Sequence, residues 1–167
     1  MTIGFVPAHR TRSATIRLDA PPERAFKMFT PLGERAWAQG WDPEFLHPLH
    51  GEACAGSVFI TRGGGMETIW TTIAHDPPTR AAYSRVTPGL HAVIVEVRLR
   101  NSDDGGTLAD VSYAFTALTP AGNDAVAEMV EGFDEWMEEW ETSINRALAL
   151  NPAEPARENS VDSVDSV

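Results

Sequence analysis

TPAGNDAVAEMVEGFDEWMEEWETSINRALAL, residues 119–150, is the stretch that decides the fold. Thr119 followed by Pro120 is typical of a helix start, because threonine can cap the first turn and proline fits its first position. Apolar side chains then recur at steps of three and four residues, which places them on one helix face. This stripe consists of Val126, Met129, Phe133, Trp136, Met137, Trp140, Ile144 and Leu148. The spacing predicts one amphipathic helix of about 25 to 29 residues, packed against a sheet.

The segment before this helix alternates apolar and polar residues, which is the period of a β-strand. Five strands fit between Ser57 and Thr119, and glycine, proline and asparagine clusters mark their turns. In the clearest of them, apolar residues occupy one face and charged residues the other. The apolar ones are Val93, Val95, Val97 and Leu99. An earlier strand from Ala14 to Leu18 precedes them, so the sequence predicts an antiparallel sheet.

Two short helices are predicted between the first strand and the others. Pro21-Pro22-Glu23 starts one of them, because proline fits the first helical turn and glutamate favours the helix N-terminus. This helix presents Ala25, Phe26 and Phe29. Thr30 can cap the second helix.

The second short helix carries two tryptophans within FTPLGERAWAQGWDP, residues 29–43. Trp37 and Trp41 lie four positions apart, so we expect both on one helix face. Each ring can bury about 150 to 250 Å², and only the 119–150 helix offers a face large enough to cover them. The prolines between residues 42 and 48 predict an irregular connection to the next strand.

Length and charge limit the remaining possibilities. The 167 residues suit a single domain, 1–150, and we expect the acidic tail 151–167 to be disordered, because it has little apolar area to bury. The net charge of −11 and the lack of a basic stripe argue against a nucleic-acid partner. No window has the apolar length of a membrane span. The N-terminal residues also lack the apolar centre of a secretion signal, so we expect a cytoplasmic protein.

The sequence lacks the motifs of common enzyme classes, including a serine elbow, a phosphate loop and paired helical histidines. His47 and His50 are spaced as metal ligands can be, but Pro48 prevents a shared helical face. No metal site and no cofactor are therefore expected. Buried polar groups could still transfer protons, and the candidates are Asp110, Glu67, Glu96, Tyr83 and Arg85. For Glu96 we prefer a solvent-facing pair with Arg98 or Arg100.

Several pieces of the chain together resemble a known family. They are APPERAFKMFT, TPLGERAWAQGWDP, the GSVFIT strand, ETIWTTIAHD and YAFTAL. Over roughly residues 10 to 150 the chain resembles the START and birch-pollen-allergen (SRPBCC) superfamily, and within it the bacterial polyketide cyclase and dehydrase-like branch. The resemblance implies an α+β helix-grip fold, in which a curved antiparallel sheet of about six to seven strands wraps around the long C-terminal helix. It also implies an internal pocket for apolar or aromatic small molecules, but no particular reaction.

An internal pocket has an energetic consequence. A dry void of about 300 Å³ would cost on the order of 7 kcal/mol, against a total stability of only about 5 to 15 kcal/mol. We therefore expect the pocket to be small, wet or occupied, with aromatic faces and a few polar groups in its lining. The sequence offers Trp70 beside Thr68 and Thr72, Tyr83 beside Arg85, and Tyr113 near Asp110.

The leading functional hypothesis is a protein that binds a hydrophobic or aromatic small molecule, lipid-like or polyketide-like, between the sheet and the C-terminal helix. The residues predicted to contact the ligand are Trp41, Trp70, Tyr83, Arg85, Tyr113, Phe115, Met129, Phe133 and Met137. An alternative is a polyketide cyclase, aromatase or dehydratase. A minor alternative is an interaction module, since a related branch of the same fold assists a chaperone ATPase. The ligand and the oligomeric state, monomer or homodimer, stay open.

Overall fold

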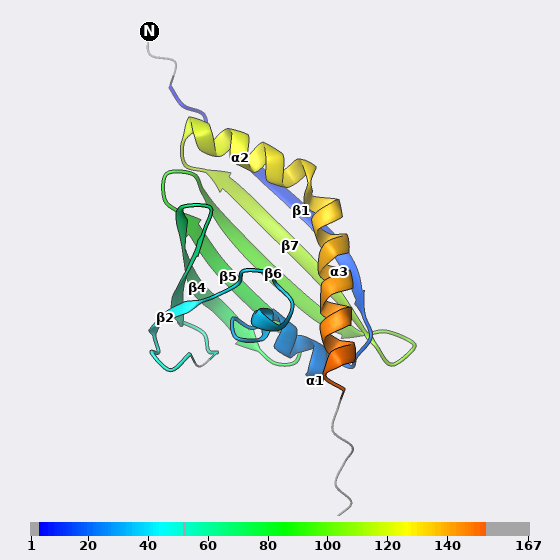
Figure 1. Ribbon diagram of the computed structural model, residues 1–167. Helices are drawn as coiled ribbons and strands as arrows, with labels where there is room; N and C mark the ends of the chain where they lie inside the picture. Colours follow the sequence, from blue (N-terminus) through cyan, green and yellow to red (C-terminus); the bar gives the residue numbers. More distant parts are fainter. Residues whose placement is uncertain (1–3, 52, 153–167) are drawn as a thin grey trace, which may run out of the picture.

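The computed structural model describes residues 4–51 and 53–152, so nearly all of the predicted tail 151–167 lies outside the described residues. One curved sheet of seven antiparallel strands dominates the fold, in the order β1-β7-β6-β5-β4-β3-β2 (Figure 1). The strands are β1 His9–Leu18, β2 Glu44–His47, β3 Val58–Gly63, β4 Met66–Asp76, β5 Arg80–Thr87, β6 His91–Asn101 and β7 Thr107–Ala117. The predicted antiparallel sheet is confirmed.

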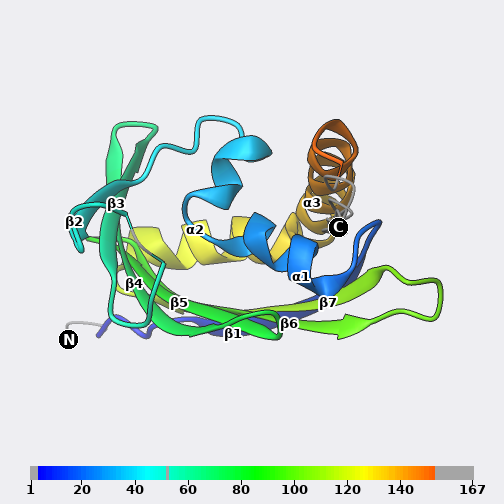
Figure 2. The same ribbon diagram turned by 90° about the horizontal axis from the view of Figure 1, so that it is seen from below.

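All helices lie on one face of this sheet (Figure 2). They are α1 Pro22–Ala25, the 3₁₀ helices η1 Phe26–Phe29 and η2 Gly33–Ala36, α2 Pro120–Glu131 and α3 Phe133–Leu150. The α3 helix packs along β1, and α2 crosses the ends of β7, β6 and β1. This arrangement is the predicted α+β helix-grip fold. Within the described residues, no helix has both the length and the apolar character needed to cross a bilayer.

The inner face of the sheet follows directly from the alternation in the sequence. Val93, Val95 and Val97 on β6 are buried, whereas Ile94 between them is exposed. Strand register then aligns inward side chains in rows across the sheet. One row joins Tyr83 on β5, Val95 on β6 and Tyr113 on β7. The neighbouring row joins Phe59, Trp70, Arg85, Val93 and Phe115, from β3 to β7. These two rows bring aromatic residues from distant parts of the chain onto one surface.

The predicted single C-terminal helix is divided in two at Gly132. Its φ of −86° and ψ of 3° lie outside the helical region, although the Gly132 amide still donates to the Glu128 carbonyl oxygen over 3.0 Å. The chain bends at this point, as Figure 1 shows. Glycine has low helix propensity, and the two halves pack on different parts of the curved sheet. A straight helix cannot follow both surfaces, and the sequence pattern did not reveal this.

The region of residues 29–47 also differs from the sequence prediction. Thr30 does act as a cap, because its Oγ1 accepts a 3.0 Å hydrogen bond from the Gly33 amide. The helix that follows is a single 3₁₀ turn, η2, and the expected common helix face for Trp37 and Trp41 does not form. Residues 44–47, predicted to be irregular, form the edge strand β2 beside β3. Short, proline-flanked edge strands carry little periodic signal, so this strand was missed.

A glycine near the start of α2 provides a test of this packing. The Gly122 amide donates to Thr119 Oγ1 over 3.0 Å, and the Thr119 hydroxyl donates to the Gly89 carbonyl oxygen over 2.6 Å. A Cβ at Gly122 would lie 1.8 Å from the backbone oxygen of Leu90, so α2 could not keep its place on the turn after β5.

We therefore expect Gly122→Ala to lower the free energy of unfolding by about 1–3 kcal/mol, through overpacking. Gly132→Ala is the matched control, because its added Cβ would approach Glu128 O only to 3.5 Å, an ordinary contact. Urea unfolding of both variants measures the difference. Equal stability of the two would contradict this account of the α2 contact.

Candidate functional site

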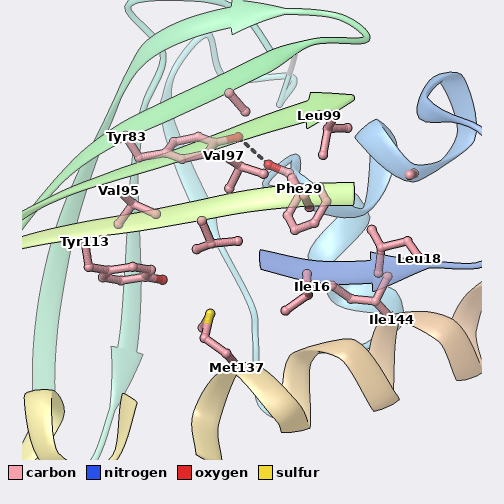
Figure 3. Packing of buried hydrophobic residues seen from close by; sticks show 14 of the residues in the cluster. Ile16, Leu18, Phe29, Tyr83, Val95, Val97, Leu99, Tyr113, Met137 and Ile144 are labelled. Atoms are coloured by element: carbon pink, nitrogen blue, oxygen red, sulfur yellow. Dashed lines mark hydrogen bonds between the residues drawn. The ribbon is translucent and has the colours of Figure 1, made fainter. Parts of the chain in front are cut away.

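A pocket of about 170 Å³ lies between the inner face of the sheet, α3 and residues 30–43, which contain η2 and are called the η2 segment below. Its lining consists of Phe29, Glu34, Trp37, Ala38, Trp41, Trp70, Tyr83, Arg85, Val95, Val97, Tyr113, Trp136 and Trp140. Figure 3 shows three of these, Tyr83, Val95 and Tyr113, projecting from adjacent strands toward the side on which Met137 and Ile144 of α3 lie. Its volume corresponds to the first of the three alternatives that the energetic argument left open, which were a small, a wet or an occupied pocket.

Two groups of aromatic rings form its walls. The sheet-side cluster, Trp41, Phe59, Trp70 and Tyr83, includes a stacked pair, Phe59 and Trp70, with ring centroids 5.6 Å apart. The helix-side cluster, Trp37, Tyr113, Trp136 and Trp140, joins α3 to β7 and to the η2 segment. Their edge-to-face contacts are the favoured geometry for aromatic rings.

Trp37 and Trp41 belong to opposite walls. The Trp37 ring contacts Trp140 on α3, with centroids 5.1 Å apart, whereas the Trp41 ring contacts Trp70 on β4 at 5.3 Å. Each indole is held by its own segment of chain: Trp37 Nε1 donates to the Met28 carbonyl oxygen over 2.8 Å, and Trp41 Nε1 donates to that of Pro31 over 2.7 Å. The expectation that α3 covers both rings is wrong for Trp41, because the sheet covers it.

Several polar side chains in the lining already have hydrogen-bond partners in the protein. The Tyr83 hydroxyl donates to the Phe29 carbonyl oxygen over 2.6 Å (Figure 3), and Trp70 Nε1 donates to Thr61 Oγ1 over 2.9 Å. These bonds fix the rings and remove their polar atoms from contact with a ligand. Among the ionisable side chains of the lining, those of Glu34, Arg85 and Tyr113 are not joined to another nitrogen or oxygen within the described residues. We call them the polar triad.

Arg85 is the cation of the triad. Its guanidinium carbon lies 5.4 Å from the Trp70 ring centroid and 5.9 Å from that of Tyr113. One terminal nitrogen contacts Met129 Sδ at 3.9 Å, and the buried Nε has no hydrogen-bond partner within residues 4–51 and 53–152. Burial lowers the pKa of this guanidinium, but an arginine still carries its charge at neutral pH.

Glu34 is the acid of the triad. As a whole residue it is half-buried, but its carboxyl group is surrounded by protein atoms. Burial raises the pKa of this carboxyl to about 8, against the opposing effect of the Arg85 charge. Glu34 is therefore mostly protonated at neutral pH and can donate a hydrogen bond. Burial also raises the pKa of the Tyr113 hydroxyl, which keeps that group neutral.

Five of the predicted ligand residues meet in this lining: Trp41, Trp70, Tyr83, Arg85 and Tyr113. The others lie around it. Met129 lines an adjoining recess with Arg85, Gly132 and Trp136. Phe115 and Phe133 are fully buried behind Tyr113, with ring centroids 5.5 and 5.7 Å from it, and Met137 is buried in the core beside them.

Sequence reasoning missed Glu34 and the contributions of Trp37, Trp136 and Trp140 to the pocket. Glu34 falls in the first turn of the second predicted short helix, and nothing in the sequence pattern shows that its side chain turns inward. The one signal available was its position three residues before Trp37, which puts both side chains on one side of a 3₁₀ turn. Trp136 and Trp140 were recognised in the apolar stripe but were assigned only to packing.

Three of the predicted proton-transfer candidates lie away from the pocket. Asp110 is on the outer face of β7, where it accepts hydrogen bonds from Arg100 and Thr15 that lower its pKa. It therefore cannot face Tyr113, which points to the inner face. Glu67 pairs with Arg62 at 3.2 Å, and Glu96 pairs with Arg98 at 2.6 Å, as preferred. Within the described residues, no three His, Cys, Asp or Glu side chains gather as a metal site.

The pocket opens toward an outer groove. Both cavities share Trp37 and Ala38 from the η2 segment and Trp136 and Trp140 from α3. The groove continues past Glu135, Glu138 and Glu139 on α3. These four shared residues form the entrance of the pocket. A molecule entering from solvent would therefore pass between them before it reached the polar triad.

Comparison with known proteins places this geometry in context. The family described as "Polyketide cyclase / dehydrase and lipid transport" matches residues 9–159. None of the curated proteins compared with the chain matches it.

Among solved structures, the crystal structure of Ara h 8.0201 has a TM-score of 0.63 and 18% identity, covering 85% of this chain and 99% of its own. A protein from Rhodobacter sphaeroides has a TM-score of 0.60 and 23% identity, with coverages of 86% and 95%. CalU16 from Micromonospora echinospora has a TM-score of 0.59 and 19% identity, covering 87% of each chain. At these identities the likeness shows the fold.

The raised pKa of Glu34 predicts a pH-dependent stability. The unfolded chain releases this proton near pH 4.5, whereas the folded protein holds it to about pH 8. Between these values the folded state binds one more proton, so stability falls as pH rises, by at most about 1.4 kcal/mol per pH unit. The contribution is fully present below the unfolded pKa and is lost once pH exceeds the folded pKa.

Glu34→Gln removes this titration. We expect the variant to gain stability relative to wild type as pH rises from 4.5 to 8, with no further relative gain above. Urea unfolding across this range measures it, with Glu131→Gln, an exposed α2 residue, as the control that follows wild type. Parallel stability curves for wild type and Glu34→Gln would show that the carboxyl is solvated.

Proposed function

Because the chain belongs to the polyketide cyclase/dehydrase and lipid transport family, we propose that it binds a hydrophobic or aromatic small molecule in the pocket between the sheet and α3. The observation that carries this proposal is the lining itself. Two aromatic clusters face each other across about 170 Å³, and their polar atoms are largely bonded within the protein. Such a site is mostly apolar with a few placed polar groups, as small-molecule sites usually are.

The volume of the pocket limits the size of its ligand. Because the pocket of about 170 Å³ opens toward the outer groove, it can hold water when no ligand is bound, and a ligand would gain free energy by displacing that water from the aromatic walls. An engineered apolar cavity of about 150 Å³ binds benzene. The volume thus favours ligands with one or two aromatic rings.

Binding can be tested with 2-naphthol, a neutral two-ring aromatic, by thermal shift and by quenching of the pocket tryptophans. We expect it to raise the unfolding midpoint progressively as its concentration exceeds the Kd, whereas sterols, too large for 170 Å³, do not. Ala38→Phe, which narrows the entrance, should weaken binding by about tenfold or more, since overpacking excludes the ligand. Ala36→Phe, on the exposed side of the same segment, should bind like wild type.

Failure of every one- and two-ring aromatic to bind would end the proposal. Equal affinity of the two alanine variants would show that the ligand sits elsewhere.

A specific observation favours a second candidate, an enzyme of the cyclase, aromatase or dehydratase type. Glu34 keeps its proton near neutral pH and lies in the same aromatic pocket as the positive charge of Arg85. A buried acid of this kind can protonate a carbonyl or hydroxyl oxygen of a bound substrate, while the pocket holds the chain folded. Arg85 would stabilise negative charge that develops on a neighbouring oxygen.

The enzyme reading makes its own prediction. If the protein cyclises or dehydrates a short poly-β-ketone thioester, Glu34→Gln should lower turnover by about 10²- to 10⁴-fold, because it removes the proton donor. The affinity of the same variant for 2-naphthol, measured in parallel, separates a loss of the proton donor from a loss of binding. Product analysis by mass spectrometry measures turnover, with Glu131→Gln as the control. Unchanged turnover in Glu34→Gln would exclude this carboxyl as the catalytic acid.

A further inference from the structure

Arg85 is half-buried, with its Nε shielded from solvent, and has no counter-ion in residues 4–51 and 53–152. Buried arginines are normally paired with carboxylates, because the desolvation of an unpaired charge is costly. The ion pairs among the described residues all involve other arginines. Among the residues that the structure describes, the one atom that accepts a hydrogen bond from the Arg85 guanidinium is the sulfur of Met129, at 3.9 Å, and a thioether is a weak acceptor. The buried Nε has no acceptor at all in the part of the chain that the structure describes.

The surroundings of Arg85 hold its guanidinium ready for a planar anion. The Trp70 and Tyr113 rings lie 5.4 and 5.9 Å from its central carbon, which orients the group and supplies cation–π attraction. The guanidinium fork matches a carboxylate, which it can bind through two parallel hydrogen bonds. Trp70, Tyr83 and Tyr113 surround the same space, so an anion bound there would have an aromatic environment for the body that carries it.

We propose that the pocket selects aromatic acids, whose carboxylate pairs with Arg85 while one or two fused rings lie between the sheet-side and helix-side clusters. This inference rests on the proposed binding function and names the ligand class that the site prefers. It also explains the placement of Glu34. A neutral Glu34 does not compete for Arg85 and can donate a hydrogen bond to the bound carboxylate; an ionised Glu34 would repel the ligand.

The preference therefore depends on pH through Glu34. The charged and titratable groups that face this carboxyl are Arg85 and Tyr83 on β5 and Tyr113 on β7. Glu135, Glu138 and Glu139 on α3 line the outer groove, and His91 on β6 also senses the Arg85 charge. Because several groups contribute to the field, the role of Glu34 must be isolated by substitution rather than by pH alone.

The experiment compares 2-naphthoate with 2-naphthamide, a neutral ligand of the same shape, by calorimetry and tryptophan fluorescence. In wild type at about pH 6.5 we expect naphthoate to bind at least about tenfold more tightly, which corresponds to one charge-assisted hydrogen-bonded pair. Near pH 9 the preference should shrink, because Glu34 ionises and occupies Arg85. In Glu34→Gln the preference should persist at both pH values.

Arg85→Met should abolish the preference while naphthamide and 2-naphthol still bind, and Arg85→Lys should retain part of it. The unfolding midpoint of Arg85→Met verifies its fold, and we expect it to equal or exceed that of wild type, since an unpaired buried charge is removed. Exposed Arg98→Met is the matched control and should keep the full preference.

The outcomes separate the two proposals. Naphthamide binding with no preference for naphthoate, or a preference that survives Arg85→Met, would overturn the selection of acids and leave the binding pocket intact. If neither naphthalene ligand nor 2-naphthol binds, the proposed binding function itself fails.

Discussion

The pocket depends on how Trp37 and Trp41 hold residues 30–43 above the sheet. Each indole nitrogen donates a hydrogen bond to a carbonyl oxygen close to it in the chain, and these local bonds orient the two rings. One ring then packs on Trp140 of α3 and the other on Trp70 of β4. Because this segment is anchored at two opposite walls, it covers the pocket without filling it. If both rings lay on one wall, the same side chains would form ordinary core.

Below this roof, the strand register determines what the pocket contains. Trp70, Arg85 and Val93 are direct cross-strand neighbours, and Tyr83, Val95 and Tyr113 form the next row. Inward-facing arginine in an otherwise aromatic and aliphatic surface is costly, because the charge loses water and gains only ring faces and a sulfur. The fold carries this cost in the wall of its pocket. Polar groups with poor partners in the wall of a pocket are characteristic of functional sites.

Burial has different effects on the charge states of Glu34 and Arg85 at neutral pH. Both lie in the same pocket, yet no ion pair joins them, and desolvation keeps the carboxyl neutral while the guanidinium stays charged. On the outer face of the sheet the same chemistry gives a different result. There Asp110 and Arg100 pair at 2.9 Å in contact with solvent, and the carboxylate is stabilised in its charged form. The sheet thus separates a conventional salt-bridged exterior from an interior site with an unpaired cation.

The sequence alone determined β1, the strands from β3 to β7, the inward face of β6, the amphipathic C-terminal region and the helix-grip family. Strand alternation and helical periodicity depend on residues close together in the chain, so both can be recognised in the sequence alone. The break at Gly132, the edge strand β2 and the opposed directions of Trp37 and Trp41 were decided by tertiary structure. So was the inward turn of Glu34, because the Arg85 charge is brought into the same pocket only by the register of β5 and the placement of η2. Contacts between residues far apart in the chain leave no periodic trace, and the chemistry of this pocket consists of such contacts.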